Sequence, residues 1–324
     1  MNYFYSYFLF ESDLQKHSPI LNLVRKVVRD KSEVIYVGES SNITFKEDDL
    51  DKRIISDIIK DDFPNKKFGS LTHPATHAGI FYQLLRNIPE KSSVKTIIVT
   101  MNLRSFDAEW IFSTLETPLQ KSMVLLRDYP PLINRFMLSF RDYDIKTDKE
   151  REKQFKSKWE YEILKFPKPF KYKNVIQWDV DLCLSGIRNA DSSYNDALTQ
   201  LACGYVKTYA FQIVVKTNPR IKDFDKIVSL AKEKNWNLVF NLLAENVEKA
   251  DELVGKELTI LMKQNRDLLV ERYHKNGVIV VDNLEKVHDS EFIDKNWTTE
   301  HYAENGRKII AKNVSKALKR VFEK

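Results

Sequence analysis

Three polar side chains could together hydrolyse an ester, and each lies at the end of a predicted strand or the start of a predicted helix. Ser40 follows a strand predicted over 33–37, and Asn102 ends a strand predicted over 94–102. His301 precedes the last predicted helix. A serine nucleophile needs a base that takes its proton and donors that hold the oxyanion, and these three residue types supply such groups.

Each of these residues also has a structural interpretation. A serine-rich turn after a strand caps a helix as often as it attacks a substrate, so Ser40 alone indicates little. His301 could equally be an ordinary histidine at the start of a helix. Because the carboxyl ends of parallel strands meet at one edge of a sheet, we expect Ser40 and Asn102 to converge there with His301 if the function is catalytic.

The elements that would position them alternate between strand and helix. Short runs of β-branched and apolar residues predict strands at 33–37, 67–71, 94–102, 236–243 and 278–282. Apolar residues at helical spacing predict helices at 18–30, 49–60, 78–88, 223–234, 247–273 and about 300–322. Residues 211–215 fit either a short edge strand or the end of a helix. This alternation is typical of an α/β domain with a parallel sheet.

The alternation breaks between residues 103 and 208. That stretch contains helical segments, a charged run and proline-broken aromatic sequence. We interpret it as a mainly helical insertion within a single domain that covers 1–324. Its aromatic residues are expected either in a core or in a cap that lines a substrate cleft, because specificity often resides in long insertions at this edge of a sheet.

Composition excludes several classes of protein. The net charge is +6, from 52 Lys and Arg against 46 Asp and Glu, and no long basic block suggests a nucleic-acid partner. Only 8 glycines occur, which argues against a glycine-rich phosphate loop, and neither common phosphate-binding glycine motif is present. Cys183 and Cys203 form no metal-binding motif, and whether they pair stays open.

The start of the chain is aromatic but does not resemble a membrane anchor. Residues 2–10 are too few to span a bilayer, and no apolar run reaches the ~20 residues that a span requires. They also lack the basic flank and cleavage site of a signal peptide, so we expect them to pack onto the fold. The compartment stays open between the cytoplasm and, if a leader has been removed, the envelope. The oligomeric state stays open as well.

The chemistry-bearing residues resemble the sequence blocks of the SGNH, or GDSL-type, hydrolases. The Gly-Asp-Ser block of that family corresponds here to Gly38-Glu39-Ser40. Its asparagine after a central strand corresponds to Asn102. Its late histidine, with a glycine five residues on, corresponds to His301 and Gly306. The resemblance covers about 31–102 and 223–322 and leaves the insertion unexplained.

This resemblance implies a fold and an activity. The fold would be a three-layer αβα sandwich with a mainly parallel, flavodoxin-like sheet. Ser40 would attack an acyl ester, such as an acetyl group on a carbohydrate, and His301 would act as general base, with no cofactor needed. Asn102, the Ser40 N–H and a backbone N–H near His73 would hold the oxyanion, with Gly69 as the nearest glycine. The alternatives are an O-acyltransferase acting on envelope polysaccharide and a non-catalytic protein that binds a glycan or a partner.

The group that orients His301 departs from the family pattern. Family members carry Asp three residues before the histidine, where this chain has Thr298. Asp294 or Glu300 could replace it, or the histidine could act in a dyad with a backbone carbonyl. We rank Asp294 above Glu300, because a loop residue can fold back whereas adjacent side chains at a helix start usually diverge.

Two further features carry weaker indications. His73 and His77 have the spacing of a metal pair, but Pro74 lies between them and no suitable third ligand is near, so we expect no metal. Arg104 could contact an anionic group of a substrate or form a surface salt bridge.

Overall fold

A sheet of five parallel strands forms the centre of the protein, in a computed structural model that describes residues 1–141 and 143–323. The strands follow the order β2-β1-β3-β6-β7. Their bounds are Val34–Gly38 for β1, Phe68–Thr72 for β2, Thr96–Met101 for β3, Asn237–Leu242 for β6 and Ile279–Asp282 for β7. The predicted parallel sheet is confirmed. This is the strand order of flavodoxin-like folds. In such folds the second strand lies on one side of the first strand and the third strand lies on its other side, so the order of strand addition reverses at this point.

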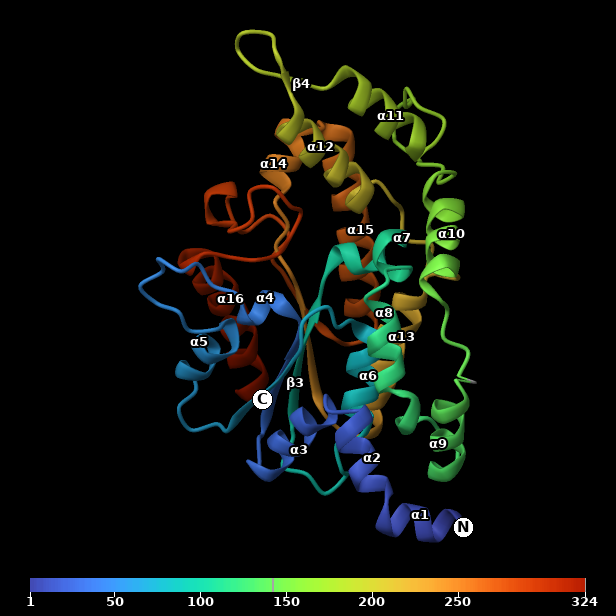
Figure 1. Cartoon of the computed structure of the whole chain (residues 1–324). Helices are drawn as coiled ribbons and strands as arrows, with labels where there is room; N and C mark the ends of the chain where they lie inside the picture. Colours follow the sequence, from blue (N-terminus) through green and yellow to red (C-terminus); the bar gives the residue numbers. More distant parts are fainter. Residues whose placement is uncertain (142, 324) are drawn as a thin grey trace.

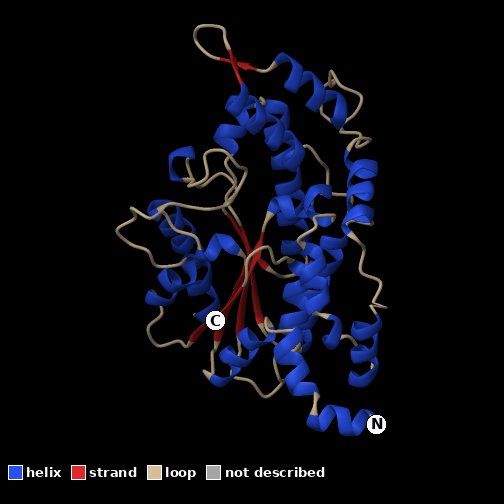
Figure 2. Cartoon of the chain, in the orientation of Figure 1, coloured by secondary structure: helices blue, strands red, loops and turns tan. Residues whose placement is uncertain are grey.

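Helices cover both faces of this sheet, as the predicted three-layer sandwich requires (Figures 1 and 2). Side chains alternate along β1, so Val34 and Tyr36 pack on one face while Ile35 and Val37 pack on the other. The first face carries α5 (Ile55–Asp61) and α16 (Glu304–Phe322). The second face carries α3 (Leu21–Arg29), α6 (Ala78–Arg86), α13 (Pro219–Glu233) and α15 (Lys256–Lys275).

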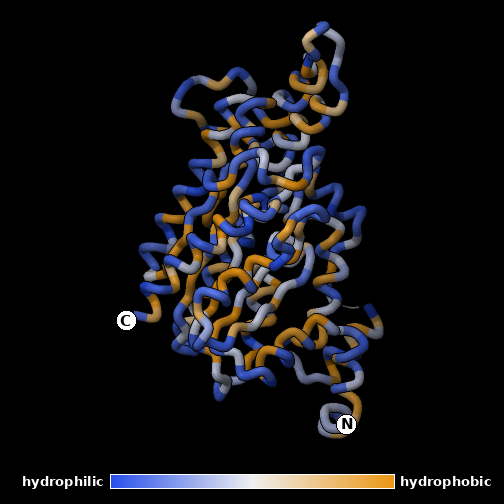
Figure 3. The backbone as a smooth tube through the Cα atoms, turned by 90° about the vertical axis from the view of Figure 1, so that its left-hand side faces the viewer, coloured by the Kyte–Doolittle hydropathy of each residue, from blue (hydrophilic) through white to orange (hydrophobic). Residues whose placement is uncertain are grey.

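The outer helices are amphipathic, which is why they stay on the sheet. In α16, Ile310, Val314 and Leu318 are fully buried, while Lys316 and Lys319 face solvent and are exposed. Figure 3 shows the alternation of hydrophobic and hydrophilic residues along this C-terminal helix. Burial of an aliphatic side chain of this size contributes about 1.5–3 kcal/mol, so the apolar stripe fixes the rotation of the helix on the sheet.

The segment from 103 to 208 consists mostly of short helices. Its first half runs down one side of the molecule and its second half rises again, so that its later part lies beyond the carboxyl edge of the sheet (Figure 1). Trp159 and Trp178 are buried within it. Its elements are η1 (Leu103–Phe106), α7 (Ala108–Ile111), α8 (Glu116–Ser122), η2 (Val124–Leu126), α9 (Pro131–Phe140), α10 (Asp148–Trp159), α11 (Val175–Ser185), β4 (Ile187–Arg188), β5 (Tyr194–Asn195) and α12 (Asp196–Tyr209). The small antiparallel β4–β5 hairpin has no counterpart in the sequence-based prediction.

The aromatic start of the chain is more exposed than predicted. It forms α1 (Asn2–Phe8) and α2 (Phe10–His17), and in α1 only Tyr5 is buried. Tyr3 is 81% exposed and Tyr7 is 72% exposed, so the expectation that this stretch packs onto the fold is wrong for most of its side chains. Within the described part of the chain, no helix is both long enough and apolar enough to cross a membrane.

Several predicted boundaries are wrong for identifiable reasons. The helix predicted over 49–60 begins at Ile55, because the fully buried Arg307 binds Asp49 and the Arg53 carbonyl and holds the residues before Ile55 in a non-helical loop. The helix predicted over 247–273 is two helices, α14 (Val247–Leu253) and α15. Gly255 separates them with a φ of +111°, a conformation that favours glycine. Residues 211–215 form neither strand nor helix.

Gly69 provides a test of packing between β2 and α3. A Cβ atom at this position would lie 2.5 Å from Ser32 Oγ and 2.7 Å from Val27 Cγ1. We therefore expect Gly69→Ala to lower the free energy of unfolding by about 1–3 kcal/mol, as overpacking usually does. Gly204→Ala is the matched control. Nothing lies within 4 Å of its added Cβ in the interior of α12, so it should stabilise by up to about 1 kcal/mol. Urea unfolding of both variants decides the prediction, and equal effects would contradict it.

Candidate active site

Ser40 begins a short helix at the carboxyl end of β1. Glu39 caps this helix, α4 (Ser40–Ile43), and its carboxylate accepts hydrogen bonds from Ser41 N at 3.0 Å and Ser41 Oγ at 2.9 Å. The first N–H groups of a helix have no partner within the helix. The backbone N–H of Ser40 is therefore available to a ligand, next to its own hydroxyl.

His301 lies against Ser40, and Asp294 lies against His301. The distance from Ser40 Oγ to His301 Nε2 is 2.9 Å, and the distance from His301 Nδ1 to Asp294 Oδ2 is 2.7 Å. Thr299 Oγ1 donates to the same carboxylate oxygen and helps to orient it. The three side chains thus form a line in which a proton leaving the serine would meet a base whose other nitrogen is already engaged.

A folded loop brings Asp294 back to His301. The loop connects η3 (Asp289–Glu291) to α16, and Phe292 pairs with Tyr302 across it. Ile293 N donates to the His301 carbonyl at 2.9 Å, which places the following residue, Asp294, beside the imidazole. Glu300 points elsewhere: it is fully buried, and Arg104 Nε lies 2.7 Å from its carboxylate.

Asn102 lies at the end of β3 and lines the same cavity as Ser40. Its Oδ1 accepts a hydrogen bond from Arg104 N at 3.1 Å. Because this bond fixes which side of the amide is the acceptor, the NH₂ group is the side left to bind a ligand. Among the described residues, none accepts a hydrogen bond from Asn102 Nδ2, so this group can donate to an oxyanion.

The structure contradicts the two expected backbone donors His73 and Gly69. The N–H of His73 donates to the Gly38 carbonyl at 3.2 Å, so it extends the pairing of β1 and β2 and is not free. Gly69 lies within β2 opposite Ile35, away from the carboxyl edge, and its missing side chain makes room for α3.

A glycine was expected to present a backbone N–H beside Ser40, but the residue at that position is Ala75. It lines the cavity beside Ser40 and has a φ of +58°, in the left-handed region that non-glycine residues rarely adopt. Within the described residues its N–H has no hydrogen-bond acceptor. Sequence reasoning missed this residue because an alanine carries no signal of a left-handed conformation.

A buried cluster holds the loop that carries Ala75. His77 caps α6, and its Nδ1 accepts from Gly79 N at 3.1 Å while its Nε2 lies 2.8 Å from Glu116 Oε1. Burial lowers the pKa of His77, which favours the neutral ring, and its Nε2 lies in close polar contact with the Glu116 carboxylate. Burial alone would raise the pKa of Glu116, but the guanidinium of Arg220 holds it at about 2. Both nitrogens of His77 are therefore occupied, which leaves neither for a metal ion.

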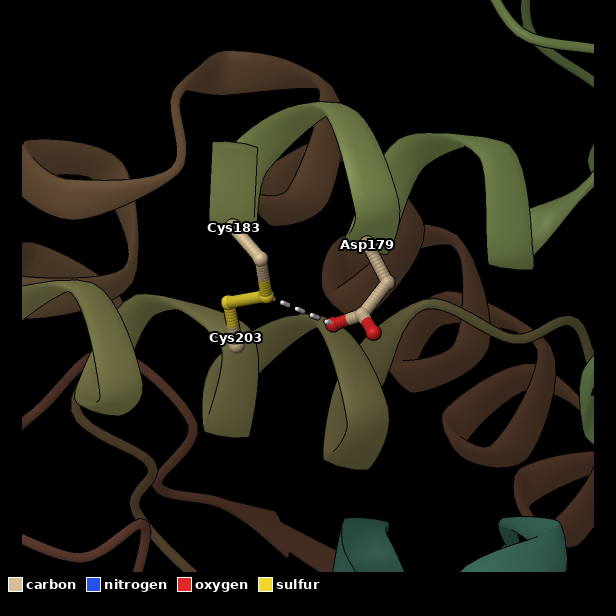
Figure 4. Close-up of side chains that lie close together, drawn as sticks. All are labelled: Asp179, Cys183 and Cys203. Atoms are coloured by element: carbon tan, nitrogen blue, oxygen red, sulfur yellow. Dashed lines mark hydrogen bonds between the residues drawn. A yellow bond between two sulfur atoms is a disulfide. The ribbon is translucent and has the colours of Figure 1, made fainter. Parts of the chain in front are cut away.

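Another group of possible metal ligands is also unsuited to a metal. Asp179, Cys183 and Cys203 lie together between α11 and α12, as Figure 4 shows. The two sulfur atoms are joined in a disulfide, which answers the open question of whether these cysteines pair. Zinc-type sites use thiolates, and a disulfide offers none. The disulfide instead ties α11 to α12, and both cysteines line the cavity.

The cavity above Ser40 is wide and has mixed chemistry. Its volume is about 1170 Å³, which exceeds the ~300–1,000 Å³ of typical small-molecule pockets. Aromatic side chains of Trp110, Tyr194 and Trp297 line it, and Trp297 is 73% exposed. Lys207 adds an exposed cation, whereas Arg104 is buried and stacks on Trp110 at 4.3 Å. Arg104 is thus neither a surface salt bridge nor a free group for a substrate.

Comparisons with known proteins show distant structural similarity to acylhydrolases. A lipase/acylhydrolase from Enterococcus faecalis shares 8% identity with a TM-score of 0.38, covering 89% of this chain and 95% of that one. A putative acylhydrolase from Bacteroides fragilis shares 9% identity with a TM-score of 0.38, covering 92% and 96%. A GDSL-like lipase from Bacteroides thetaiotaomicron shares 10% identity with a TM-score of 0.37, covering 93% and 99%.

No model of a protein family matches the sequence, and no curated protein matches it. Structural similarity at this level does not specify an activity, so the chemistry has to be inferred from the geometry of the site.

Glu39 yields a prediction about stability and pH. Burial, followed by the nearby charge of Glu300, raises the pKa of Glu39 to about 7 from an ordinary value of 4.5. A carboxyl group whose pKa is raised by folding stabilises the fold at low pH, and this contribution is lost as pH rises from about 4.5 to about 7. Glu39→Gln removes this titration. We expect the variant to gain stability relative to the wild type by up to about 3 kcal/mol between pH 4.5 and pH 8.

The measurement for Glu39 is urea unfolding of both proteins across this pH range. The exposed Glu271→Gln is the control, since its carboxylate lies on the surface of α15. A constant difference between Glu39→Gln and the wild type at all pH values would contradict the prediction.

Proposed function

We propose that this protein is a serine-dependent esterase of the SGNH type, acting on acyl esters. The observation that carries the proposal is the continuous hydrogen-bonded line from Ser40 Oγ through His301 to Asp294, with distances of 2.9 and 2.7 Å. Such distances fall within the ~2.6–3.2 Å that a nucleophile and its base require. A protein that only binds a ligand has no need of this alignment.

In the proposed mechanism, Ser40 Oγ attacks the ester carbonyl while its proton passes to His301 Nε2. Asp294 holds the Nδ1–H of His301 and stabilises the imidazolium that forms. The N–H groups of Ser40 and Ala75 and the amide of Asn102 are the donors available to the oxyanion. His301 then gives its proton to the leaving alcohol. Water, activated by the same histidine, releases the acyl group and restores the serine.

The cavity supports an ester on a carbohydrate as the substrate. A volume of about 1170 Å³ is far larger than an acetyl group needs, so most of it must serve the alcohol part of the ester. Exposed aromatic rings such as Trp297 and Tyr194 offer flat apolar faces with polar edges, which suit sugar rings. These rings come partly from the 103–208 segment, and we propose that its later part acts as a cap that sets specificity.

The size of this cavity also fits an acyltransferase, which is the second candidate function. A transferase needs the same serine chemistry but also space for an acceptor hydroxyl beside the acyl-enzyme. The width of the cavity supports such an acceptor site. A mixture of an activated acetyl ester with oligosaccharides distinguishes the two, because only a transferase yields acetylated sugar in excess of free acetate.

Replacement of the nucleophile tests the proposal. Ser40→Ala should abolish hydrolysis of p-nitrophenyl acetate, with a loss on the order of 10⁶ in kcat in the best-studied serine hydrolase. Labelling by a fluorophosphonate, followed by peptide mass spectrometry, should mark Ser40 and no other serine. Ser229→Ala on the surface of α13 is the control and should match the wild type. Equal rates for the wild type and Ser40→Ala would sink the proposal.

The carboxylate that orients His301 gives a separate test. Asp294→Asn keeps the shape but reverses the hydrogen-bonding preference at His301 Nδ1, so it favours the wrong tautomer. In a template triad the matching change lowers kcat by ~10⁴, and we expect a fall of at least about 10² here. Asp267→Asn, whose carboxylate is exposed on α15, is the control. If Asp294→Asn stays within a few-fold of the wild type, His301 acts in a dyad instead.

A further inference from the structure

Each proposed catalytic side chain has a near neighbour in the chain that enters one buried polar cluster behind the site. Glu39 precedes Ser40, Arg104 lies two residues after Asn102, and Glu300 precedes His301. Glu39 is 5% exposed, Arg104 is 8% exposed and Glu300 is fully buried. The cluster therefore adjoins all three segments that form the site, which are the turns after β1 and β3 and the loop that carries His301.

Two further groups complete the cluster from other elements. Glu245 follows β6, and Tyr209 ends α12. Tyr209 OH donates to Glu245 Oε2 at 2.5 Å. Burial, and then the neighbouring carboxyl group of Glu300, raise the pKa of Glu245, and within the described residues Glu245 Oε1 and both carboxylate oxygens of Glu300 have no hydrogen-bond partner. Arg104 joins the other side of Glu300, with Nε 2.7 Å from its carboxylate, and Arg104 Nη1 donates to the Thr298 carbonyl at 2.7 Å.

The charges of this cluster do not balance if every carboxyl group is ionised. Glu39, Glu245 and Glu300 would carry three negative charges against the single positive charge of Arg104. A buried charge without a partner is expensive, and it is relieved by protonation of the carboxyl group. Glu300 is the carboxylate in contact with Arg104, so its charge is compensated. Burial raises the pKa of Glu245 well above its usual range, in agreement with a proton on that residue.

We propose that Glu300 and Glu245 are positioning residues that share one proton, held on Glu245, and that this pair locks the His301 loop onto the turn that carries Asn102. The proposal rests on the proposed esterase function, which supplies the activity that the lock would serve. Protonated Glu245 donates to Glu300, and ionised Glu300 binds Arg104. The carbonyl of Thr298 binds the same guanidinium, so the loop is held at two points, both within three residues of His301.

Loss of the shared proton should loosen this lock. At alkaline pH the two carboxylates would face each other without water, and their repulsion would act on residue 300, directly beside His301. The charged and titratable groups that act on the pair are Arg104 from η1, Glu39 from the turn after β1, Tyr205 and Tyr209 from α12 and, on the loop itself, Tyr302. The expected consequence is a fall in kcat on the alkaline side, with little change in KM.

Two amide variants separate this role from a merely structural one. Glu245→Gln imitates the protonated acid, since its NH₂ can still donate to Glu300. We expect its kcat at pH 7 within about threefold of the wild type, and its alkaline fall shifted upward or removed. Glu300→Gln leaves Arg104 buried without a counter-charge. We expect its kcat to fall on the order of 10²-fold, with little change in KM, because small displacements at a site cost that much.

The pH profiles of kcat and KM for p-nitrophenyl acetate test the proposed role of Glu245 and Glu300, with Glu271→Gln as the surface control. Equal losses in Glu245→Gln and Glu300→Gln would overturn the proposal, as would an alkaline fall unchanged by Glu245→Gln. Urea unfolding against pH provides a readout that needs no activity. If Ser40→Ala showed the esterase function to be wrong, Glu245→Gln should still gain stability over the wild type above neutral pH, and the absence of that gain would overturn the shared proton by itself.

Discussion

The parallel pairing of β1 with both β2 and β3 determines where chemistry can occur in this protein. Because β2 lies on one side of β1 and β3 on the other, the segments that leave β1 and β3 diverge and open a crevice at their carboxyl ends. Ser40 leaves β1 and Asn102 leaves β3 at this point, so two of the three chemical groups are positioned by sheet order alone. The third, His301, needs a long loop to reach the same crevice.

That loop is positioned by polar contacts that the fold has to bury. Arg104, Glu300 and Glu245 lie beneath the site with at most 8% exposure, where apolar residues would pack with less cost. Charges in such positions are poor sources of stability, but they are directional, and each removes alternative positions for the segment that carries it. The molecule thus uses costly interactions next to Ser40 and His301 and ordinary apolar packing elsewhere in the sheet.

The sequence predicted those parts of the fold that depend on local pattern. All five strands could be read from short apolar runs, and their parallel arrangement followed from the helices between them. The boundary of α5 could not be predicted, because it depends on Arg307, which lies far away in the chain. The left-handed backbone of Ala75 was equally hidden, because an alanine side chain gives no indication of that conformation.

The sequence identified Asp294 as a candidate but could not predict its position at the site. Its place on a loop made it a candidate partner for His301, but loop position alone leaves many conformations open. The pairing of Phe292 with Tyr302 selects among them, because it sets residues 293 and 301 opposite each other and brings the next carboxylate to the imidazole. Phe292 and Tyr302 are both buried and their rings are in contact, so apolar packing enforces this register. The orientation of the imidazole is therefore a product of core packing, and in the proposed mechanism a carboxylate seven residues before His301 takes the role that the resemblance assigned to one three residues before it.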